Sequence, residues 1–564
     1  MYNYNKKKTS LKTTNSSKNV SSFKFFLLSE LVVSVLFTLC SISFHADISL
    51  LAFPIALIFS GFFVYFSFIK VYLKGQQKYF WYCLKFIQYV PTVFILTFIV
   101  QRSGKYGMPK ILDIISAILW ILVFVFSFVL QYYMSDKRNE KLSEMWREKA
   151  DKKRKPIGLQ RVLYELIDWI DALLQVVFLV FIVQIFTFQL YVIPSESMVP
   201  EFLVKDRVVV EKIGSGPKFP LTDTGLPTFT KYKRGDIVVL RNPHYTMDRN
   251  AEVKTVSSQL VYMLTFMAVN LNKDDYGEVK ADPLVKRIVG LEGEQLVMQD
   301  GILYKRNKNN DVFTPIPDKE DYASWTLNSV KPNVKKGVKV FPLSQNDYDR
   351  MLDFEEERRN FDLEAAAFRV TECVNSIRKL DAEGYLTDYE NLDSVLGTLS
   401  SWIPSKNNLR DIYQESNYRI NVMYKCTFAE YILRKAELNK SGLTQALWKS
   451  DKGLLDLENK LETIQWYINI LDMRNMPVFP ANDENGNPVY IPEGCYFMMG
   501  DNRFNSLDLR HRYEEIEVPL TKDDPESIKY YSIMEPQYLH KKYILGKPIF
   551  RFWPASRMGK LSKK

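Results

Sequence analysis

Five apolar runs in the first 190 residues constrain the fold more than any other feature of the chain. They lie at residues 25–44, 49–69, 82–100, 112–133 and 169–190. An apolar α-helix needs about 17–25 residues to cross a bilayer, so these runs predict a membrane region of five helices. Pro91 interrupts the third run and Lys85 lies near its start, so a buried or interfacial helix is an alternative there.

The basic residues predict the orientation of these helices. The 564-residue chain has a formal net charge of +10, and two segments, 1–24 and 135–161, account for the whole excess. Lysine and arginine next to membrane helices face the cytoplasm and its anionic lipid. We therefore expect both segments in the cytoplasm, the chain after the fifth run outside, and no nucleic-acid-binding surface. The 101–110 loop, which carries three basic residues on the outer side, departs from this rule.

Residues 161–172, just before the fifth run, have helical apolar spacing with acids on one face. Two interpretations are open. The segment is either an interfacial lead-in with Trp169 near the headgroups, or a simple continuation of the fifth helix.

A serine motif follows the fifth run at once, in the stretch Val192–Pro200. Pro194 and Pro200 flank it, and proline restricts its own backbone and that of the preceding residue. We therefore expect a rigid, extended loop that presents Ser197. Taken alone, the motif also fits an ordinary polar loop.

A lysine in an apolar, alternating stretch comes next, in Leu284–Gly290. The alternation predicts a strand, with Lys286 and Ile288 on one face and Val285 and Arg287 on the other. A serine hydroxyl needs a base to become nucleophilic, and lysine serves only as the neutral amine, which burial favours. The alternative is a solvated lysine, because lysine is almost never fully buried.

The third motif, Gly500–Arg510, has the composition of a turn. It holds charged and hydroxyl side chains, namely Asp501, Asn502, Ser506, Asp508 and Arg510. On its own, this motif also fits a charged surface turn.

The three motifs, in this order behind a membrane span, resemble those of the bacterial type I signal peptidases. Stretches 202–212 and 234–240, rich in β-branched residues, and the C-terminal stretch 544–554 resemble strands of that family. The resemblance covers residues 169–300 and 490–559.

The resemblance implies a role for each residue of the motifs. Ser197 would be the nucleophile and Lys286 its general base, while Ser195 and the Ser197 amide would form the oxyanion hole. Ser506 would orient the lysine amine. The remaining supporting residues would be Asp501, Asn502, Asp508 and Arg510, the last two as an ion pair. Two positions depart from the family: Glu196 stands where many relatives have glycine, and Phe504 where an acidic residue is common.

The implied fold is a multi-helix transmembrane anchor with a mainly-β extracytoplasmic catalytic domain of the signal-peptidase type. The implied activity is removal of signal peptides from exported preproteins, by a serine endopeptidase that cuts after small residues (Ala-x-Ala) through an acyl-enzyme. The location would be the bacterial inner membrane, with preproteins and the lipid bilayer as partners.

The expected organisation has six parts. They are the membrane region 1–134, the basic loop and lead-in 135–168, the last membrane helix 169–190, the catalytic parts 191–342 and 476–564, and a large α-helical insertion at 343–475. The insertion is predicted from the apolar seam that starts at Leu454 and ends at Leu471, from Phe354, Phe361 and Phe368, and from a helix over 418–436. The seam fits an intramolecular core, and a protein partner of the insertion is the alternative.

Histidine and cysteine usage argues against other kinds of site. The four histidines have no metal-ligand spacing and suggest no Ser-His-Asp arrangement, and no glycine-rich phosphate loop precedes a helix. We expect no metal and no cofactor. A disulfide between Cys373 and Cys426 is left open.

Overall fold

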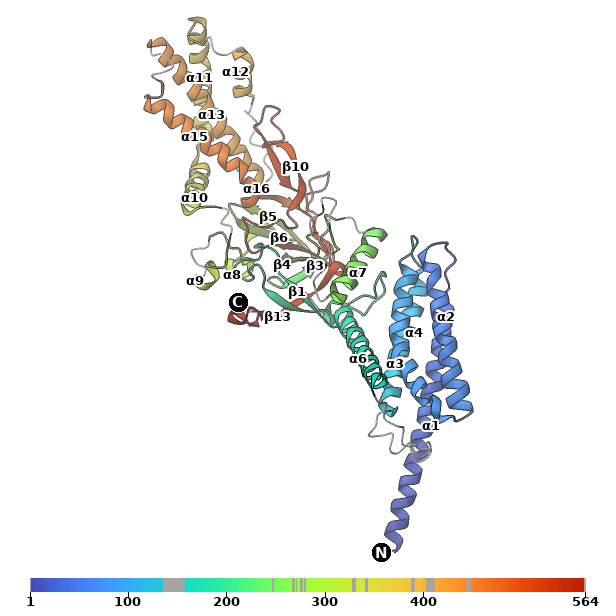
Figure 1. The fold of residues 1–564 in the computed structure, drawn as a ribbon. Helices are drawn as coiled ribbons and strands as arrows, with labels where there is room; N and C mark the ends of the chain where they lie inside the picture. Colours follow the sequence, from blue (N-terminus) through green and yellow to red (C-terminus); the bar gives the residue numbers. More distant parts are fainter. Residues whose placement is uncertain are drawn as a thin grey trace. The chain divides into compact units, whose positions relative to one another are not determined.

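The computed structural model of the chain divides into two compact units. Unit 1 comprises Met1–Gln189, Glu211–Phe229 and Tyr245–Ala281, and unit 2 comprises Leu190–Val210, Thr230–His244 and Asp282–Lys564 (Figure 1). The structure describes residues 2–134, 158–245, 248–265, 269, 271–273, 277, 280–326, 331–339, 343–386, 391–401, 411–442 and 448–561. Most of the basic loop predicted at 135–168 lies outside these residues.

Unit 1 is made of apolar helices. Five of them, within the described residues, are long and apolar enough to cross a membrane, which confirms five candidate spans. They are α1 (Tyr2–Cys40), α2 (Ala52–Phe63) continued by the π-helix η2 (Val64–Leu73), α3 (Phe80–Arg102), α4 (Lys110–Met134) and α6 (Leu159–Phe186). Pro91 is accommodated inside α3, so the third run forms a single helix. Large apolar side chains such as Phe128, 71% exposed, point outward, as contact with lipid requires.

One of the three basic residues of the 101–110 loop, Arg102, is neutralised inside unit 1. Arg102 is fully buried, and its Nε donates to Asp113 Oδ1 at 2.7 Å. A second bond joins Arg102 Nη1 to Gln101 Oε1 at 2.9 Å. This pairing gives a physical reason for one of the three basic residues that depart from the expected charge distribution, because a buried ion pair does not act as a free loop charge.

The last apolar helix differs from its predicted bounds of 169–190. Helix α6 begins at Leu159, so residues 161–172 are helical and continuous with it. It ends at Phe186, and the strand β1 (Phe188–Val192) follows at once. The backbone leaves the helix because it pairs with the next segment: Lys212 N donates to Thr187 O at 2.8 Å, and β1 lies beside β2 (Arg207–Glu211).

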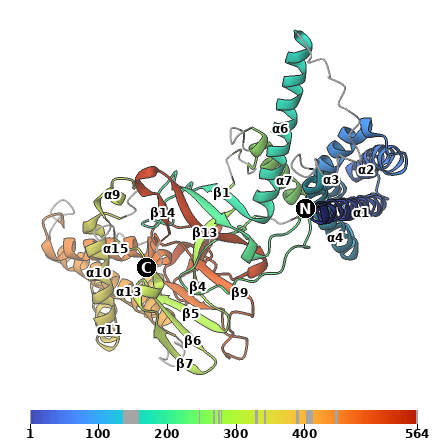
Figure 2. The same ribbon diagram turned by 90° about the horizontal axis from the view of Figure 1, so that it is seen from below.

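Unit 2 is built on an eight-stranded sheet. The strand order is β1-β2-β13-β3-β4-β9-β12, with β14 paired to β13. The bounds not yet given are β3 (Ile237–Leu240), β4 (Leu284–Gly290), β9 (Cys495–Met499), β12 (Leu539–His540), β13 (Ile544–Trp553) and β14 (Gly559–Lys560). Strands β4 and β9 are antiparallel neighbours in the interior of this sheet (Figure 2). Two segments far apart in the sequence therefore lie side by side.

A second sheet and a hairpin complete the β structure. The sheet has the order β7-β6-β5-β8, and the hairpin is β10-β11. Their bounds are β5 (Glu294–Gln299), β6 (Ile302–Asn307), β7 (Asn310–Pro315), β8 (Met476–Phe479), β10 (His511–Pro519) and β11 (Lys529–Met534). One apolar core joins the two sheets, with Val238, Ile288, Leu296 and Phe497 fully buried in it.

A helical segment lies between β7 and β8 in the sequence. Its main helices are α10 (Gln345–Asn360), α11 (Leu363–Ala382), α12 (Leu392–Ser400), α13 (Ile412–Lys440), α15 (Lys452–Asn469) and α16 (Leu471–Arg474). The short helices α8 (Asp318–Asp321) and α9 (Pro332–Lys335) precede them, and α7 (Arg249–Leu264) belongs to unit 1. Short 3₁₀ turns are η1 (Ile48–Leu51), η3 (Gln77–Tyr79), η4 (Ile213–Ser215), η6 (Lys541–Tyr543) and η7 (Ala555–Arg557).

The seven-residue phenylalanine repeat does not form one helical face. Phe354 is buried on α10, Phe361 is the extended residue that ends α10, and Phe368 on α11 is 67% exposed. Asp362 starts a new helix there, because its carboxylate accepts hydrogen bonds from the amides of Glu364 and Ala365. The leucine–isoleucine seam does reach a core, in which Ile464, Ile468 and Leu471 are buried.

Candidate functional site

The serine loop follows β1 and is a set of turns rather than the extended segment expected from its prolines. Val199 N donates to Glu196 O at 3.1 Å, and Phe202 N donates to Met198 O at 3.0 Å. Met198 and Val199 are buried, and this burial favours the turns over an extended loop. Ser197 is 9% exposed.

Ser195, in contrast, lies on the exposed side of this loop. Its hydroxyl donates to Ser197 Oγ at 3.2 Å. A hydroxyl donor therefore lies directly beside the Ser197 hydroxyl.

Lys286 lies on β4, in the interior of the eight-stranded sheet, and is 2% exposed. Its Nζ donates to Ser506 Oγ at 3.2 Å. Burial lowers the pKa of Lys286 to about 8, because an ammonium group is poorly solvated there, while the nearby Asp508 charge opposes the shift. The alternative of a solvated strand lysine is wrong.

Gly500, at the end of β9, is the point at which the serine loop meets Ser506. A Cβ placed on Gly500 would lie 2.5 Å from Ser197 O and 2.1 Å from Ser506 Oγ. Both distances are shorter than any real contact of a Cβ atom, so only glycine fits here. Asn502 N donates to Ser197 O at 3.1 Å and fixes the same approach. The serine motif, the lysine partner and the turn 500–510 therefore converge on one place.

The Asp508 carboxylate accepts hydrogen bonds from several residues of the turn 500–510. Its Oδ2 accepts from Ser506 Oγ at 2.8 Å and from Gly500 N at 2.9 Å, and its Oδ1 accepts from Arg510 Nε at 2.9 Å. Burial alone would raise the pKa of Asp508, but the Arg510 guanidinium outweighs burial and holds this pKa well below its usual range. Asp508 is therefore a fixed anion that orients Ser506 toward Lys286.

Asp501 pairs with a residue that the strand pattern had placed on the opposite face from Lys286. Arg287 Nε and Nη2 donate to the two oxygens of Asp501 at 2.8 and 2.6 Å. Arg287 also lies over the Tyr322 ring, at 4.1 Å from its centroid. Arg287 is itself buried because β4 is covered on both faces from Lys286 onward. The Asp501 carboxylate neutralises this buried cation next to Lys286.

Two further residues of the turn connect it to the region around the helical segment. Arg503 Nη2 donates to Asp321 Oδ1 at 2.7 Å, and Phe504 stacks edge-on against Trp325, with ring centroids 5.1 Å apart. Phe504 belongs to the core that contains Met351 of α10. The phenylalanine at this unusual position is therefore a packing contact with the helices. Sequence reasoning missed Arg287, Asp321 and Arg503 because their partners lie in other motifs.

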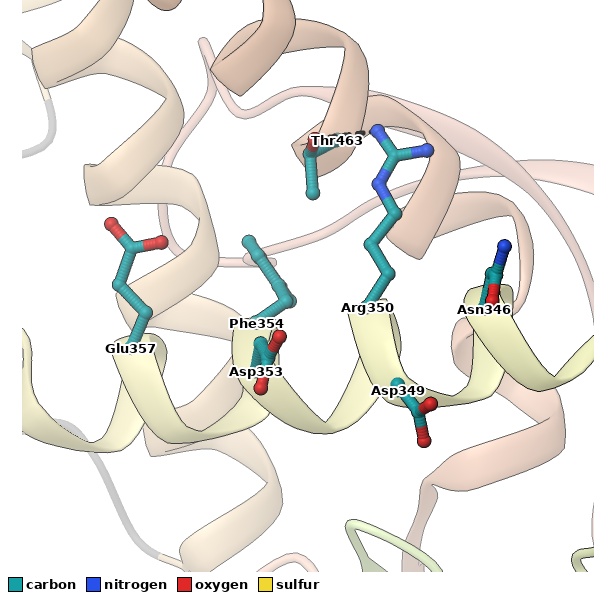
Figure 3. Close-up of a pocket in the computed structure, with 7 residues that line it drawn as sticks. All are labelled: Asn346, Asp349, Arg350, Asp353, Phe354, Glu357 and Thr463. Carbon is teal, nitrogen blue, oxygen red and sulfur yellow. Dashed lines mark hydrogen bonds between the residues drawn. The ribbon is translucent and has the colours of Figure 1, made fainter.

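No cluster of three or more metal-binding side chains occurs among the described residues. His511 is buried, and burial together with the Arg510 charge lowers its pKa to about 3, so it is neutral. All five cysteines are free thiols, including Cys373 and Cys426. A cavity of about 400 Å³ between α10 and α15 is lined by Asp349, Arg350, Asp353 and Glu357, and it contains none of the predicted site residues (Figure 3).

Comparison with known proteins supports the resemblance to signal peptidases that the motifs indicated. Residues 166–351 match the family described as signal peptidase, peptidase S26. The chain is 26% identical over 218 residues to signal peptidase I of Haemophilus influenzae, covering 36% of this chain and 58% of that protein. It is 29% identical over 167 residues to signal peptidase I P of Bacillus subtilis subsp. natto, covering 29% and 63% of the two chains.

A third relative, signal peptidase I of Buchnera aphidicola subsp. Schizaphis graminum, is 35% identical over 79 residues, which are 14% of this chain and 25% of that protein. The chain thus spans less than two thirds of the length of each of these relatives. Residues 166–351 are thus similar to the S26 signal peptidases, and five helices among the described residues are long and apolar enough to cross a membrane; both findings support a membrane-associated serine peptidase. The similarity to proteins named signal peptidase I confirms the resemblance that was drawn from the motifs.

Proposed function

We propose that this protein is a membrane-bound serine endopeptidase that removes N-terminal signal peptides from exported preproteins. The convergence at Gly500 carries the proposal, because it brings the Ser197 backbone against the hydroxyl that contacts Lys286. A lysine with a pKa of about 8 is partly neutral near physiological pH, as a general base must be.

In the proposed reaction Lys286 removes the proton from Ser197 Oγ, and the oxygen attacks the scissile carbonyl carbon. The oxyanion would be stabilised by the Ser197 amide and the Ser195 hydroxyl, and one such donor is typically worth about 100- to 1,000-fold in rate. The Lys286 ammonium then protonates the departing amine, which leaves an ester on Ser197. Lys286 next takes a proton from water, and the hydroxide attacks the ester carbonyl carbon. The ester C–O bond then breaks, the Lys286 ammonium returns the proton to Ser197 Oγ, and the signal peptide leaves with a free carboxylate.

The remaining family properties are part of the same proposal. Substrates would carry small residues, of the Ala-x-Ala type, before the cut. The enzyme would lie in the bacterial inner membrane, with Ser197 on the extracytoplasmic side. A preprotein inserts its apolar segment into the same bilayer, so the membrane anchor would raise the effective substrate concentration. The helical segment would be an insertion into the catalytic domain, and it is a candidate surface for a protein partner.

The test is cleavage of a preprotein with an Ala-x-Ala site by the detergent-solubilised full chain. We expect cleavage at that site by the wild type, and loss of cleavage in Ser197→Ala and Lys286→Met. Lys212→Met is the matched control, because burial lowers the pKa of Lys212 to about 8 as well, yet its Nζ donates to Gln184 O at 3.0 Å, outside the site. Folded wild type that cleaves none of several preproteins would contradict the proposal and would favour an inactive membrane scaffold.

A further inference from the structure

A short segment of unit 2 lies directly against the serine loop. We call residues 331–339, which include α9, the strap. Val338 of the strap shares a small apolar cluster with Val199 and Leu203, and all three are buried. The approach is close: a Cβ on Gly337 would lie 2.4 Å from Leu203 Cδ1. The strap therefore packs closely against Leu203 at a position that has no side chain.

The second contact between strap and loop involves the residue just before Ser197. Lys339 N donates to Glu196 Oε1 at 2.6 Å. Glu196 is only 6% exposed, although it is an acidic residue in a loop. A hydrogen bond to a charged acceptor is roughly twice as strong as a neutral one, so this bond ties the strap firmly to the loop.

The backbone carbonyl group of Glu196 is held by two further hydrogen bonds. Its carbonyl oxygen accepts from Asn502 Nδ2 at 3.2 Å and from Val199 N at 3.1 Å. In a trans peptide the C=O and the following N–H point in opposite directions. The Glu196–Ser197 peptide is thus oriented so that the Ser197 N–H points away from Asn502. The two anchors of Glu196, at its carbonyl and at its carboxylate, together determine this peptide plane.

We propose that Glu196 is a positioning residue that holds the Ser197 amide for the oxyanion by anchoring its carboxylate on the Lys339 N–H of the strap. The inference rests on the proposed function and deepens it. It makes peptidase activity depend on the strap, which belongs to the region around the helical segment rather than to the serine motif. Glu196 contacts no reacting atom in this scheme; it acts through the peptide that it shares with Ser197.

The first experiment compares Glu196→Ala with Glu196→Gln in the full chain, with cleavage of an Ala-x-Ala preprotein as the readout. Loss of the anchor misaligns an oxyanion donor, and we expect kcat of Glu196→Ala to fall about 10- to 100-fold with KM unchanged. Glutamine keeps an acceptor oxygen for Lys339 N–H, so Glu196→Gln should recover most of kcat. A kcat for Glu196→Gln as low as that of Glu196→Ala, or an unchanged kcat in Glu196→Ala, would overturn the inference.

The second experiment moves the strap without touching Glu196. Gly337→Ala should lower kcat, because its Cβ meets Leu203 at 2.4 Å. Gly397→Ala on α12 is the matched control, since no atom lies within 4 Å of its added Cβ. Equal kcat in both variants would overturn the inference. Failure of the proposed function looks different: the wild type itself would then neither cleave preproteins nor react with a serine-directed fluorophosphonate.

Discussion

Two lysines in different regions of unit 2 are equally buried, but their amine groups have different hydrogen-bond partners. Lys286 on β4 and Lys425 on α13 are each 2% exposed. Lys425 Nζ donates directly to the Asp524 carboxylate at 2.6 Å, whereas Lys286 Nζ donates to the Ser506 hydroxyl at 3.2 Å. Burial lowers the pKa of both amines, and Asp524 opposes this at Lys425 by direct contact.

The difference lies in where the carboxylate stands. At Lys425 the anion touches the ammonium and stabilises the charged form, which makes an ion pair between α13 and the chain that links β10 to β11. At Lys286 the anion, Asp508, is one hydroxyl further away and is already paired with Arg510. One added hydroxyl therefore separates a structural lysine from one that can give up its proton.

The largest effect expected from this difference is on the free energy of unfolding of variants at the two lysines. Lys425→Met leaves Asp524 buried without its cation, and we expect the free energy of unfolding to fall by about 3–5 kcal/mol. Lys286→Met removes a poorly solvated amine that has no carboxylate in contact, so the free energy of unfolding should rise. Denaturant unfolding of both variants at pH 7 measures this. Changes of the same sign would contradict the proposed difference between the two sites.

A smaller effect concerns the hydroxyl that separates Lys286 from Asp508. Ser506→Ala removes the group that orients the amine, and kcat should fall about 10- to 100-fold. Because a hydrogen bond accepted from the ammonium favours the charged form, its loss should also move the acidic limb of the rate profile to lower pH. Ser532→Ala is the matched control, since Ser532 Oγ also donates to a carboxylate, Asp472, at 2.7 Å. Equal losses in both variants would contradict the role of Ser506.

The smallest effect is the pH dependence of the wild type. The rate should rise as pH increases through about 8, because only the neutral Lys286 amine acts as base. The folded state also binds this proton more weakly than the unfolded chain, so Lys286 contributes a gain in stability as pH rises from about 8 to 10.5. The kcat/KM profile of Lys212→Met should be unchanged. A midpoint of the wild-type rate profile near pH 10.5 would show that burial does not lower the pKa of the Lys286 amine.

The amino-acid pattern was sufficient for features that depend on neighbouring residues. Runs of apolar residues produce the five candidate membrane helices among the described residues, because such a run must form a helix wherever it meets lipid. The alternation in 284–290 produces a strand with a buried Lys286, and the 418–436 pattern falls inside α13. The family resemblance was likewise visible in the sequence, because it depends on short motifs and on their order along the chain.

Contacts between distant residues decided the rest. The end of α6 at Phe186 depends on pairing with the β2 region, which no property of residues 169–190 reveals. Arg287 was expected on the other face of its strand from Lys286, yet it is buried because its partner Asp501 comes from a turn 214 residues later. The reason for glycine at positions 500 and 337 is visible only in the fold. There, Gly500 lies close to Ser197 and Ser506, and Gly337 lies close to Leu203.

The sequence by itself thus determined which segments are apolar helices and strands and which side chains are candidates for the reaction. Only the tertiary structure decided which carboxylate faces which cation, because burial and pairing depend on segments that the fold brings together. The same physical rule separates Lys286 from Lys425. Both are lysines within regular secondary structure, and the distance to a carboxylate supplied by a remote loop distinguishes a candidate base from an ion pair.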